Sequence, residues 1–207
     1  MASTVLYLLR HAETQWNRDK RIQGQWDSEL HPDGHAAAEA FAPLLEGLGF
    51  SRILSSDLGR AKFTAGIFNL RLRLPVTLER RLREQHFGQW TGKHWRDIPE
   101  EDKLAATAAG WDFRPPGGES RNEVRQRAEH ALIDAARINP GRTLLVVTHQ
   151  GVLKAVLYDL LGRDYAPDAP AAFDLSRLQR LVCQDGVLAV DALDVDPAKE
   201  VAAPDAP

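Results

Sequence analysis

The chain has only one cysteine, Cys183, among its 207 residues. A single cysteine excludes an intrachain disulfide and any metal site built from several cysteines, and it fits a reducing compartment. No apolar run approaches the ~20 residues of a membrane-spanning helix, and the first residues lack the basic segment and cleavage site of a signal peptide. We therefore expect a cytoplasmic protein with no membrane partner.

An excess of charge of one sign is also lacking. The 26 Lys and Arg residues and 29 Asp and Glu residues leave a formal net charge of −3. This balance gives no whole-protein attraction to nucleic acid, so we expect no nucleic-acid partner. Any preference for an anion must come from arginines that are arranged locally. The hydrophobic content of 43% is that of an ordinary globular domain.

Apolar runs and helical patterns alternate along the chain. The patterns predict strands at 4–9, 52–54, 75–78 and 143–148, helices at 32–48, 57–69, 100–109, 121–138 and 151–161, and a closing strand pair at 178–183 and 187–193. This order predicts a three-layer α/β/α sandwich with a mostly parallel, doubly wound sheet and one antiparallel edge strand. We expect a single domain over residues 1–195 and a disordered tail over 196–207.

Two local patterns predict where helices begin. Ser55-Ser56-Asp57 supplies side chains that could cap the helix after them. Ser120 and Glu123 have the spacing of a capping box, which predicts the start of the helix at 121–138.

Two histidines each stand where a buried strand ends and a turn begins. They are His11, in VLYLLRHAE, and His149, in LLVVTHQGV. Ligands collect at the carboxyl ends of strands in open α/β sheets, so neighbouring strands would bring both imidazoles into one crevice. A neutral imidazole can attack phosphorus and form a covalent intermediate, and we expect a backbone carbonyl to fix its other ring nitrogen. Arg10 beside His11 offers a fork of donors for phosphate oxygens.

Two further residues suit the same chemistry. Arg60 lies in the first turn of the helix after Ser55-Ser56-Asp57, where free backbone N–H groups favour an anion. Glu84 has apolar and aromatic neighbours in LREQHFGQW, which suits a raised pKa and donation of a proton to a leaving oxygen. Taken alone, Arg60 is better interpreted as a solvated helix residue, and the alternative for Glu84 is a surface charge.

Six motifs taken together are far more specific. In chain order they are LLRHAETQWN, RIQGQWDSELHPDG, SSDLGRAKFTA, LREQHFGQW, PPGGES and VVTHQGV. This ordered set, which covers about residues 6–151, resembles the histidine phosphatase superfamily, the group of cofactor-dependent phosphoglycerate mutases and many phosphatases.

The resemblance implies a role for each matching position. His11 would be the phosphoryl-accepting nucleophile, and Glu84 would be the acid for the leaving alcohol and then the base for water. The residues around the transferring group would be Arg10, Arg60 and His149, assisted by Asn17, Gln23 and Gly24. Two arginines and a protonated His149 would neutralise charge without Mg²⁺, so we expect no metal and no cofactor.

The chain departs from the family pattern in ways that bear on the reaction. Gln150 follows the second histidine where the family often has glycine, which adds a polar side chain near the mouth of the site. Mutases of the family carry a longer insertion after the acid residue, with paired arginines for the substrate carboxylate. Residues 91–115 here are few and offer only Arg96 and Arg114, far apart.

We therefore predict a metal-independent phosphomonoester hydrolase that acts on a small phosphorylated metabolite. A mutase-type phosphoryl transfer is one alternative, and a catalytically silent module that binds phosphorylated ligands is another. A metallohydrolase built on the two histidines is disfavoured, because no paired-histidine or clustered-carboxylate ligand set accompanies them.

The substrate and the oligomeric state stay open. Sugar phosphates, phosphoglycerate derivatives and ribazole phosphate all fit the resemblance, and a homodimer is compatible with the sequence. Several aromatic residues lie in segments that are expected to border the site and could stack on a substrate, although we expect most of them to be packing residues: Trp26, His86, Phe87, Trp90, Trp95 and Trp111.

Overall fold

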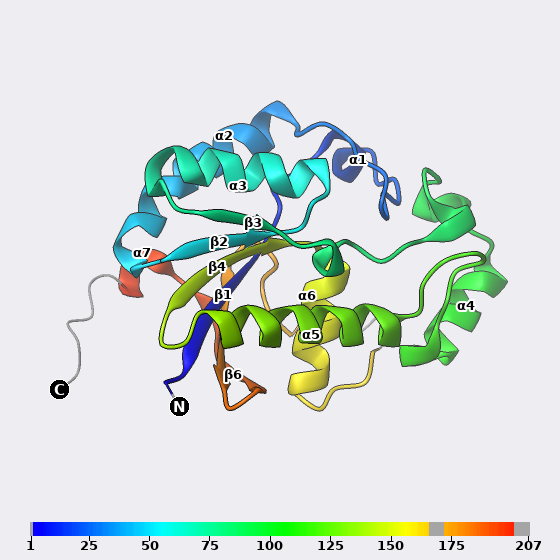
Figure 1. Ribbon diagram of the computed structural model, residues 1–207. Helices are drawn as coiled ribbons and strands as arrows, with labels where there is room; N and C mark the ends of the chain where they lie inside the picture. The colour runs from blue at the N-terminus through cyan, green and yellow to red at the C-terminus, as the bar shows by residue number, and fades with distance from the viewer. Residues whose placement is uncertain (1, 166–171, 201–207) are drawn as a thin grey trace.

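A six-stranded sheet forms the centre of the computed structural model, which describes residues 2–165 and 172–200 (Figure 1). The strands lie in the order β3-β2-β4-β1-β5-β6. Their bounds are β1 Thr4–Arg10, β2 Arg52–Ser55, β3 Val76–Leu78, β4 Thr143–Thr148, β5 Leu178–Gln184 and β6 Val187–Val195. The pairs β1–β4, β4–β2 and β2–β3 are parallel, whereas β5 runs antiparallel to both β1 and β6. The predicted mostly parallel sheet is confirmed, with β5 as the one reversed strand and β6 at the edge.

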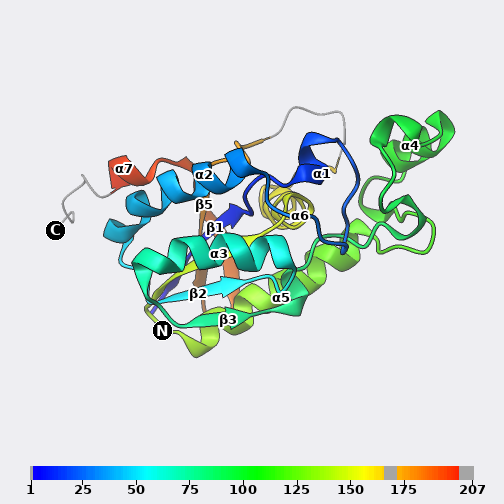
Figure 2. The ribbon, with the colours of Figure 1, turned by 90° about the horizontal axis from the view of Figure 1, so that it is seen from above.

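Helices cover both faces of this sheet (Figures 1 and 2). The helices are α1 Gln15–Arg18, α2 Pro32–Phe41, α3 Gly59–Leu72, α4 Glu100–Ala108, α5 Arg121–Ile138, α6 Gln150–Leu160 and α7 Pro197–Glu200. Helices α2, α3 and α7 lie on one face, and α5 and α6 lie on the other. The predicted three-layer sandwich is therefore confirmed. Within the described ranges no helix is both long and apolar enough to cross a bilayer.

Short 3₁₀ segments link several of these elements. They are η1 Ala42–Leu48, η2 Arg80–Leu82, η3 Gly88–Trp90, η4 Trp95–Asp97 and η5 Gly110–Asp112. The helix predicted over 32–48 is α-helical only to Phe41 and continues as η1. Pro43 explains the change, because proline has no N–H to donate to the preceding turn.

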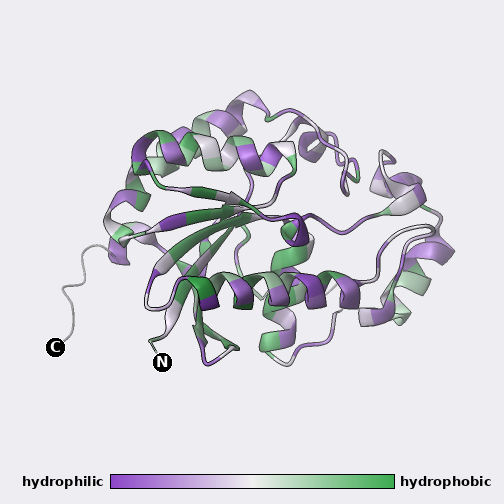
Figure 3. Ribbon diagram, viewed as in Figure 1, coloured by the Kyte–Doolittle hydropathy of each residue, from purple (hydrophilic) through white to green (hydrophobic). Residues whose placement is uncertain are grey.

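The two inner strands bury both of their faces. In β1, Leu6 and Leu8 pack against α5 and α6, whereas Tyr7 and Leu9 pack against α2 and α3. Strand β4 repeats this alternation, and its four central residues are 0% exposed. Figure 3 shows the result as hydrophobic strands between helices that are hydrophilic on their outer sides. A strand that is covered on both faces reads as a continuous apolar run, which is why the sequence located β1 and β4 well.

The expected cap of α3 is corrected by the structure. Its N-cap residue Leu58 makes no side-chain cap hydrogen bond. The carboxylate of Asp27 instead accepts a hydrogen bond from the Gly59 N–H, with an N–O distance of 2.7 Å. Asp57 instead binds the guanidinium of Arg83 through both oxygens at 2.6 Å, and of the three expected residues Ser56 accepts a backbone N–H, that of Leu58, at 3.3 Å. By contrast, the capping box at Ser120 is present as predicted.

The expected disorder from residue 196 onward is corrected for its first part. Residues Pro197–Glu200 form α7. The Glu200 carboxylate binds the guanidinium of Arg180 and accepts a hydrogen bond from the Tyr7 hydroxyl at 3.2 Å. These two contacts anchor α7 to the sheet. The rest of the predicted tail, 201–207, lies outside the described residues.

A half-buried ionic cluster joins α5 to α6. The Arg125 guanidinium lies 3.2 Å from the carboxylates of both Glu129 and Asp159. The Oε1 atom of Glu129 is buried and has no hydrogen-bond partner among the described residues. Burial raises the pKa of Glu129 to about 7, with Arg125 opposing the rise and Asp159 adding to it. The folded protein therefore holds a proton on Glu129 more tightly than the unfolded chain does.

This cluster predicts a pH-dependent stability. Because the folded-state pKa of Glu129 is raised, the protein should lose stability as pH rises from about 4.5 to about 7. Glu129→Gln removes the ionisation, so we expect the variant to gain about 1–3 kcal/mol over wild type at about pH 8 and almost nothing at about pH 5. Thermal unfolding across this pH range checks it, with Glu46→Gln, at an exposed ion pair, as control. A gain that does not change with pH would contradict the prediction.

Candidate active site

The pairing of β1 with β4 brings two histidines together. Arg10 is the register partner of Thr148, and the backbone N–H of His11 donates to the Thr148 carbonyl at 2.9 Å. The rings of His11 and His149 consequently lie with their centroids 5.1 Å apart and their planes at 57°. Both residues are buried, with exposed fractions of 6% and 0%. The two strand-end imidazoles thus occupy one crevice at the carboxyl ends of the parallel strands.

Hydrogen bonds fix the tautomer of His11. Its Nδ1 lies 2.7 Å from the carbonyl oxygen of Ala12, which can only accept, so Nδ1 carries the proton. The lone pair therefore stays on Nε2, where the Nε–H of Arg60 donates to it at 3.2 Å. Burial, Arg60 and Arg10 hold the pKa of His11 well below its usual value. In the free protein His11 is thus a neutral imidazole with a lone pair on Nε2.

Arg60 is a fully buried guanidinium on the first turn of α3, with an exposed fraction of 1%. Its NH2 group donates to the carbonyl of Gly24 at 2.7 Å, and its NH1 group donates to the carbonyl of Trp26 at 2.8 Å. Gly24 has a φ of +52°, in the left-handed region that favours glycine. The chain around Gly24 thereby turns its carbonyls onto Arg60.

His149 is the N-cap residue of α6 and is held from β2. Its Nε2 lies 2.8 Å from the hydroxyl of Ser56. Burial first, and then the charge of Arg60, hold the pKa of His149 well below its usual value. The expectation of a protonated His149 is therefore corrected for the free protein, because the ring is desolvated and faces cations.

Three buried polar atoms in this region have no hydrogen-bond partner among the described residues. They are Nε of Arg10, Nδ1 of His149 and Oε1 of Gln23. Buried polar groups are nearly always paired, so unpaired ones call for a ligand or water. Two of the three belong to side chains that can donate to an oxyanion. These atoms indicate a site for a tetrahedral anion beside His11.

Asn17 and Gln23 are held in place through Thr14. The Oδ1 atom of Asn17 accepts hydrogen bonds from the backbone N–H and the hydroxyl of Thr14, at 3.1 and 3.0 Å. The Nε2 atom of Gln23 donates to the same hydroxyl at 2.8 Å. Thr14, which the sequence analysis did not single out, thus links two of the expected site residues.

Glu84 reaches the site from the segment after η2. Its Oε1 accepts the N–H of Gln85 at 2.8 Å, and its Oε2 accepts the N–H of Gly151 at 3.1 Å. A Cβ atom at Gly151 would lie 2.2 Å from Oε1, so a larger residue at this position would push the Glu84 carboxylate out of its place. The carboxylate of Glu84 is therefore seated against the first turn of α6.

Arg127 of α5 holds the backbone of the same segment. Its guanidinium donates to the carbonyls of Arg81 and Glu84 at 2.6 and 3.1 Å. It also binds both oxygens of Glu119, at 2.6 and 2.9 Å. Sequence reasoning missed Arg127 because an arginine on a predicted helix reads as a solvated charge. Glu119 lies in the PPGGES motif, which was the only signal for this contact.

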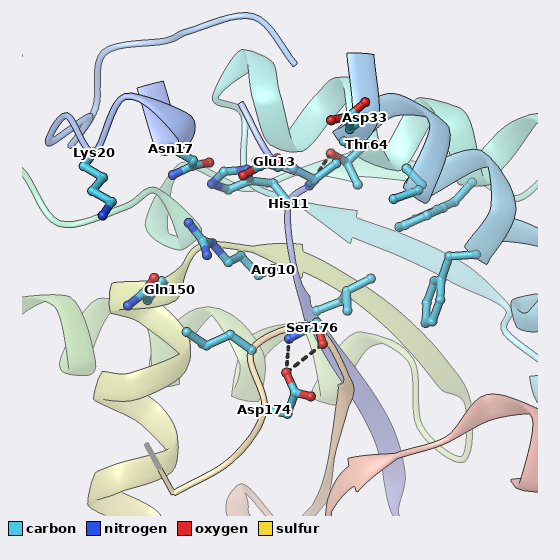
Figure 4. A pocket seen from close by; sticks show the side chains of 18 of the residues that line it. Arg10, His11, Glu13, Asn17, Lys20, Asp33, Thr64, Gln150, Asp174 and Ser176 are labelled. Carbon is cyan, nitrogen blue, oxygen red and sulfur yellow. Dashed lines mark hydrogen bonds between the residues drawn. The ribbon is translucent and has the colours of Figure 1, made fainter. Parts of the chain in front are cut away.

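A cavity of about 880 Å³ opens beside these residues. Figure 4 shows Arg10, Asn17, Lys20 and Gln150 around it, with His11 at its upper side. Arg10, His11, Asn17 and Gln150 line the cavity, whereas Gln23, Gly24, Arg60, Glu84 and His149 are not among its lining residues. The site thus has an outer, accessible part and an inner part that holds the nucleophile from behind.

The aromatic residues expected to border the site do not line this cavity. Trp90 packs in a separate small core with Phe113, and Trp26 and Trp95 are 62% and 44% exposed. The aromatic side chains that line the cavity are Phe41 and Phe68. Aromatic residues near a motif in sequence therefore were a poor guide to the cavity wall.

Arg96 and Arg114 also lie away from the cavity. The Arg96 side chain is 80% exposed and lies beside Asp97, and Arg114 pairs with Glu123 at 2.6 Å. Neither lines the cavity. Within residues 2–165 and 172–200, no three His, Cys, Asp or Glu side chains gather as a set of metal ligands.

The comparisons with known proteins agree on one family. The histidine phosphatase superfamily (branch 1) matches residues 6–195. A probable phosphoglycerate mutase GpmB from Cronobacter sakazakii is 37% identical over 166 residues, which are 76% of this chain and 74% of that protein. Bacillus stearothermophilus YhfR superposes with a TM-score of 0.83 and 32% identity, covering 94% of this chain and 99% of its own. A mycobacterial glucosyl-3-phosphoglycerate phosphatase in complex with VO3 has a TM-score of 0.79 and 30% identity, with 93% and 99% covered.

Proposed function

This chain belongs to the histidine phosphatase superfamily, and on that premise we propose that it hydrolyses phosphomonoesters of small metabolites through a phosphohistidine on His11, without a metal ion or cofactor. The observation that carries the proposal is the state of His11, whose Nδ1 is engaged by the Ala12 carbonyl while Nε2 keeps its lone pair. Arg60 and the unpaired Nε of Arg10 lie at this nucleophile. A neutral nucleophile beside buried guanidinium groups is what phosphoryl transfer requires.

In the first half of the proposed reaction, Nε2 of His11 attacks phosphorus and the bond to the leaving oxygen breaks. The hydrogen bond that the Nε–H of Arg60 donates to Nε2 of His11 shifts to a phosphoryl oxygen. This shift frees the lone pair of Nε2 for the attack. Arg10 and His149 donate hydrogen bonds to the other phosphoryl oxygens and offset the negative charge on these oxygens. Glu84, in its acid form, gives a proton to the leaving alkoxide.

In the second half, water replaces the alcohol. Glu84, now a carboxylate, takes a proton from this water as its oxygen attacks phosphorus, and the bond to Nε2 breaks. Inorganic phosphate leaves, and Glu84 is again protonated. Atoms and charge therefore balance without a cofactor, because Glu84 regains the proton that it gave to the alcohol. The two arginines stay protonated throughout.

Hydrolysis is favoured over mutase-type transfer by the positions of Arg96 and Arg114, although Lys20 and Arg21 do line the cavity. A mutase must bind a phosphoglycerate by its carboxylate, and the arginines expected for that task, Arg96 and Arg114, do not line the cavity. The structural neighbour with VO3 bound is named a glucosyl-3-phosphoglycerate phosphatase. A mutase remains the second candidate, since the relative at 37% identity is named a probable phosphoglycerate mutase.

The nucleophile can be tested directly. His11→Ala removes the only atom proposed to accept the phosphoryl group, so we expect loss of acid-labile, phosphohistidine-type labelling and a fall in kcat of at least about 1,000-fold on an aryl phosphate. His130→Ala, at an exposed histidine of α5, should keep both. Substantial turnover by His11→Ala would exclude this histidine as the nucleophile. Wild-type protein that binds phosphate but hydrolyses no phosphomonoester would instead support the silent module.

The proton donor can be tested with leaving groups of different basicity. Glu84→Gln cannot protonate the departing oxygen, so we expect a loss of about 100-fold or more for alkyl phosphates and much less for p-nitrophenyl phosphate. Steady-state kinetics of both substrate types check this, with Glu46→Gln as a control for removal of a surface carboxylate. An equal loss on both substrate types would remove Glu84 from the role.

Product analysis separates hydrolysis from transfer. With 3-phosphoglycerate, in the presence of a chelator, we expect inorganic phosphate and glycerate at a rate at least about tenfold above formation of 2-phosphoglycerate. Phosphate release and isomer formation are measured in one reaction by ³¹P NMR. Predominant isomer formation would favour the mutase, and activity abolished by the chelator would contradict the metal-independent mechanism.

A further inference from the structure

The first turn of α3 is capped by a carboxylate from a distant segment. Asp27 accepts the N–H of Gly59 at 2.7 Å through Oδ2, and the N–H of Arg60 at 3.3 Å through Oδ1. The N-terminus of this 14-residue helix favours an anion there. The sequence predicted an anion at this position and suggested substrate phosphate. The structure places a side chain of the protein there instead, because Asp27 already occupies both N–H groups.

The same carboxylate also neutralises a buried charge. The Oδ1 atom of Asp27 lies 3.3 Å from NH1 of Arg60, and this is the carboxylate that forms an ion pair with Arg60 in the described part of the chain. The Arg60 side chain is 1% exposed, whereas that of Asp27 is 45% exposed. A buried guanidinium needs a counter-charge and hydrogen-bond acceptors to remain in place. Asp27 supplies a counter-charge from the solvent side, and Glu84 is a second carboxylate whose charge acts on Arg60.

The geometry of the guanidinium transmits this contact to the nucleophile. A guanidinium group is planar, so acceptors that fix one edge also set the direction of the opposite N–H. Asp27 and the carbonyls of Trp26 and Gly24 hold NH1 and NH2. The remaining donor, Nε, then points at Nε2 of His11 at 3.2 Å. Asp27 is thereby connected to the nucleophile through one rigid side chain.

We propose that Asp27 is a positioning residue for phosphoryl transfer, whose negative charge sets the orientation of Arg60 against His11. The inference rests on the proposed function, since it assigns Asp27 a part in that reaction. Asp27 itself does not contact His11 in this network and acts through Arg60. Its role as a helix cap is separate, because an uncharged side chain can cap a helix but cannot neutralise a guanidinium.

Two variants separate the charge from the cap. Asparagine caps helices about as well as aspartate, so Asp27→Asn should keep the midpoint of thermal unfolding within about 2 °C of wild type. It removes the counter-charge, so we expect kcat/KM on an aryl phosphate to fall about 10- to 100-fold. Asp27→Ala loses both cap and charge and should show a similar kinetic loss with a lower unfolding midpoint. Glu46→Gln, which removes an ion pair with Arg71 near the other end of α3, is the matched control and should change neither quantity.

A spectroscopic measurement reports the orientation itself. In ¹⁵N-labelled protein, the Nε2 resonance of His11, assigned from its absence in His11→Ala, senses the hydrogen bond that Arg60 donates. We expect this resonance to shift in Asp27→Asn toward the value of an imidazole nitrogen without a donor, and to stay unchanged in Glu46→Gln. A residue that only caps α3 would leave it in place.

The outcomes decide between the two roles. Wild-type kcat/KM in Asp27→Asn would overturn the proposal, as would loss of activity in Asp27→Ala alone, which would leave the cap as the only role. A fall of more than about 10 °C in the midpoint of thermal unfolding of Asp27→Asn would also overturn it, since the ion pair would then serve folding. If the wild-type protein hydrolyses no phosphomonoester, the proposed function fails, but the His11 resonance still tests the orienting role of Asp27.

Discussion

Burial of the Arg60 guanidinium is the constraint on which the rest of the site depends. A cation with an exposed fraction of 1% must find an acceptor for nearly every N–H, since an unpaired buried charge is far more costly than an unpaired surface charge. The carbonyls of Gly24 and Trp26 meet this need, so the chain between β1 and α2 is wrapped around the first turn of α3. The nucleophile His11 then takes the last edge of the guanidinium. The positions of His11, Gly24 and Trp26 around Arg60 follow from one buried charge.

The same cations explain why two histidines can serve opposite needs of one reaction. Arg60 and Arg10 disfavour a positive charge on His11, and burial does the same, so its ring stays neutral and nucleophilic. His149 experiences the same forces in the free protein. A phosphoryl group would reverse the sign of the local field, which favours a proton on His149 but leaves the attacking nitrogen of His11 engaged with phosphorus. The two unpaired nitrogens, Nε of Arg10 and Nδ1 of His149, are the donors that we propose for the phosphoryl group.

Local sequence patterns predicted those parts of the fold and of the inner site that are formed by interactions between residues close in sequence. Strands β1 and β4 are buried on both faces, and Ser120 begins α5 through its own capping box, so neighbouring residues carried each signal. Contacts across the chain were invisible to this reasoning. The cap of α3 comes from Asp27, 32 residues before Gly59, while the nearer Asp57 is bound by Arg83. Apparent surface charges and small residues acquire their meaning only from partners that the fold supplies.

The acid and the nucleophile are supported by different parts of the fold, and this division bears on how the site works. Glu84 is held by α5 through Arg127 and by α6 through the N–H of Gly151, where a Cβ would lie 2.2 Å from its carboxylate. His11 is held by α3 through Arg60 and by the Ala12 carbonyl. Helices α3 and α5 cover opposite faces of the sheet, so the sheet and its β1–β4 pairing are what align the two groups. In the proposed reaction a substrate that contacts both groups would bring proton transfer and attack together, so the chemistry depends on the alignment that the central strands provide.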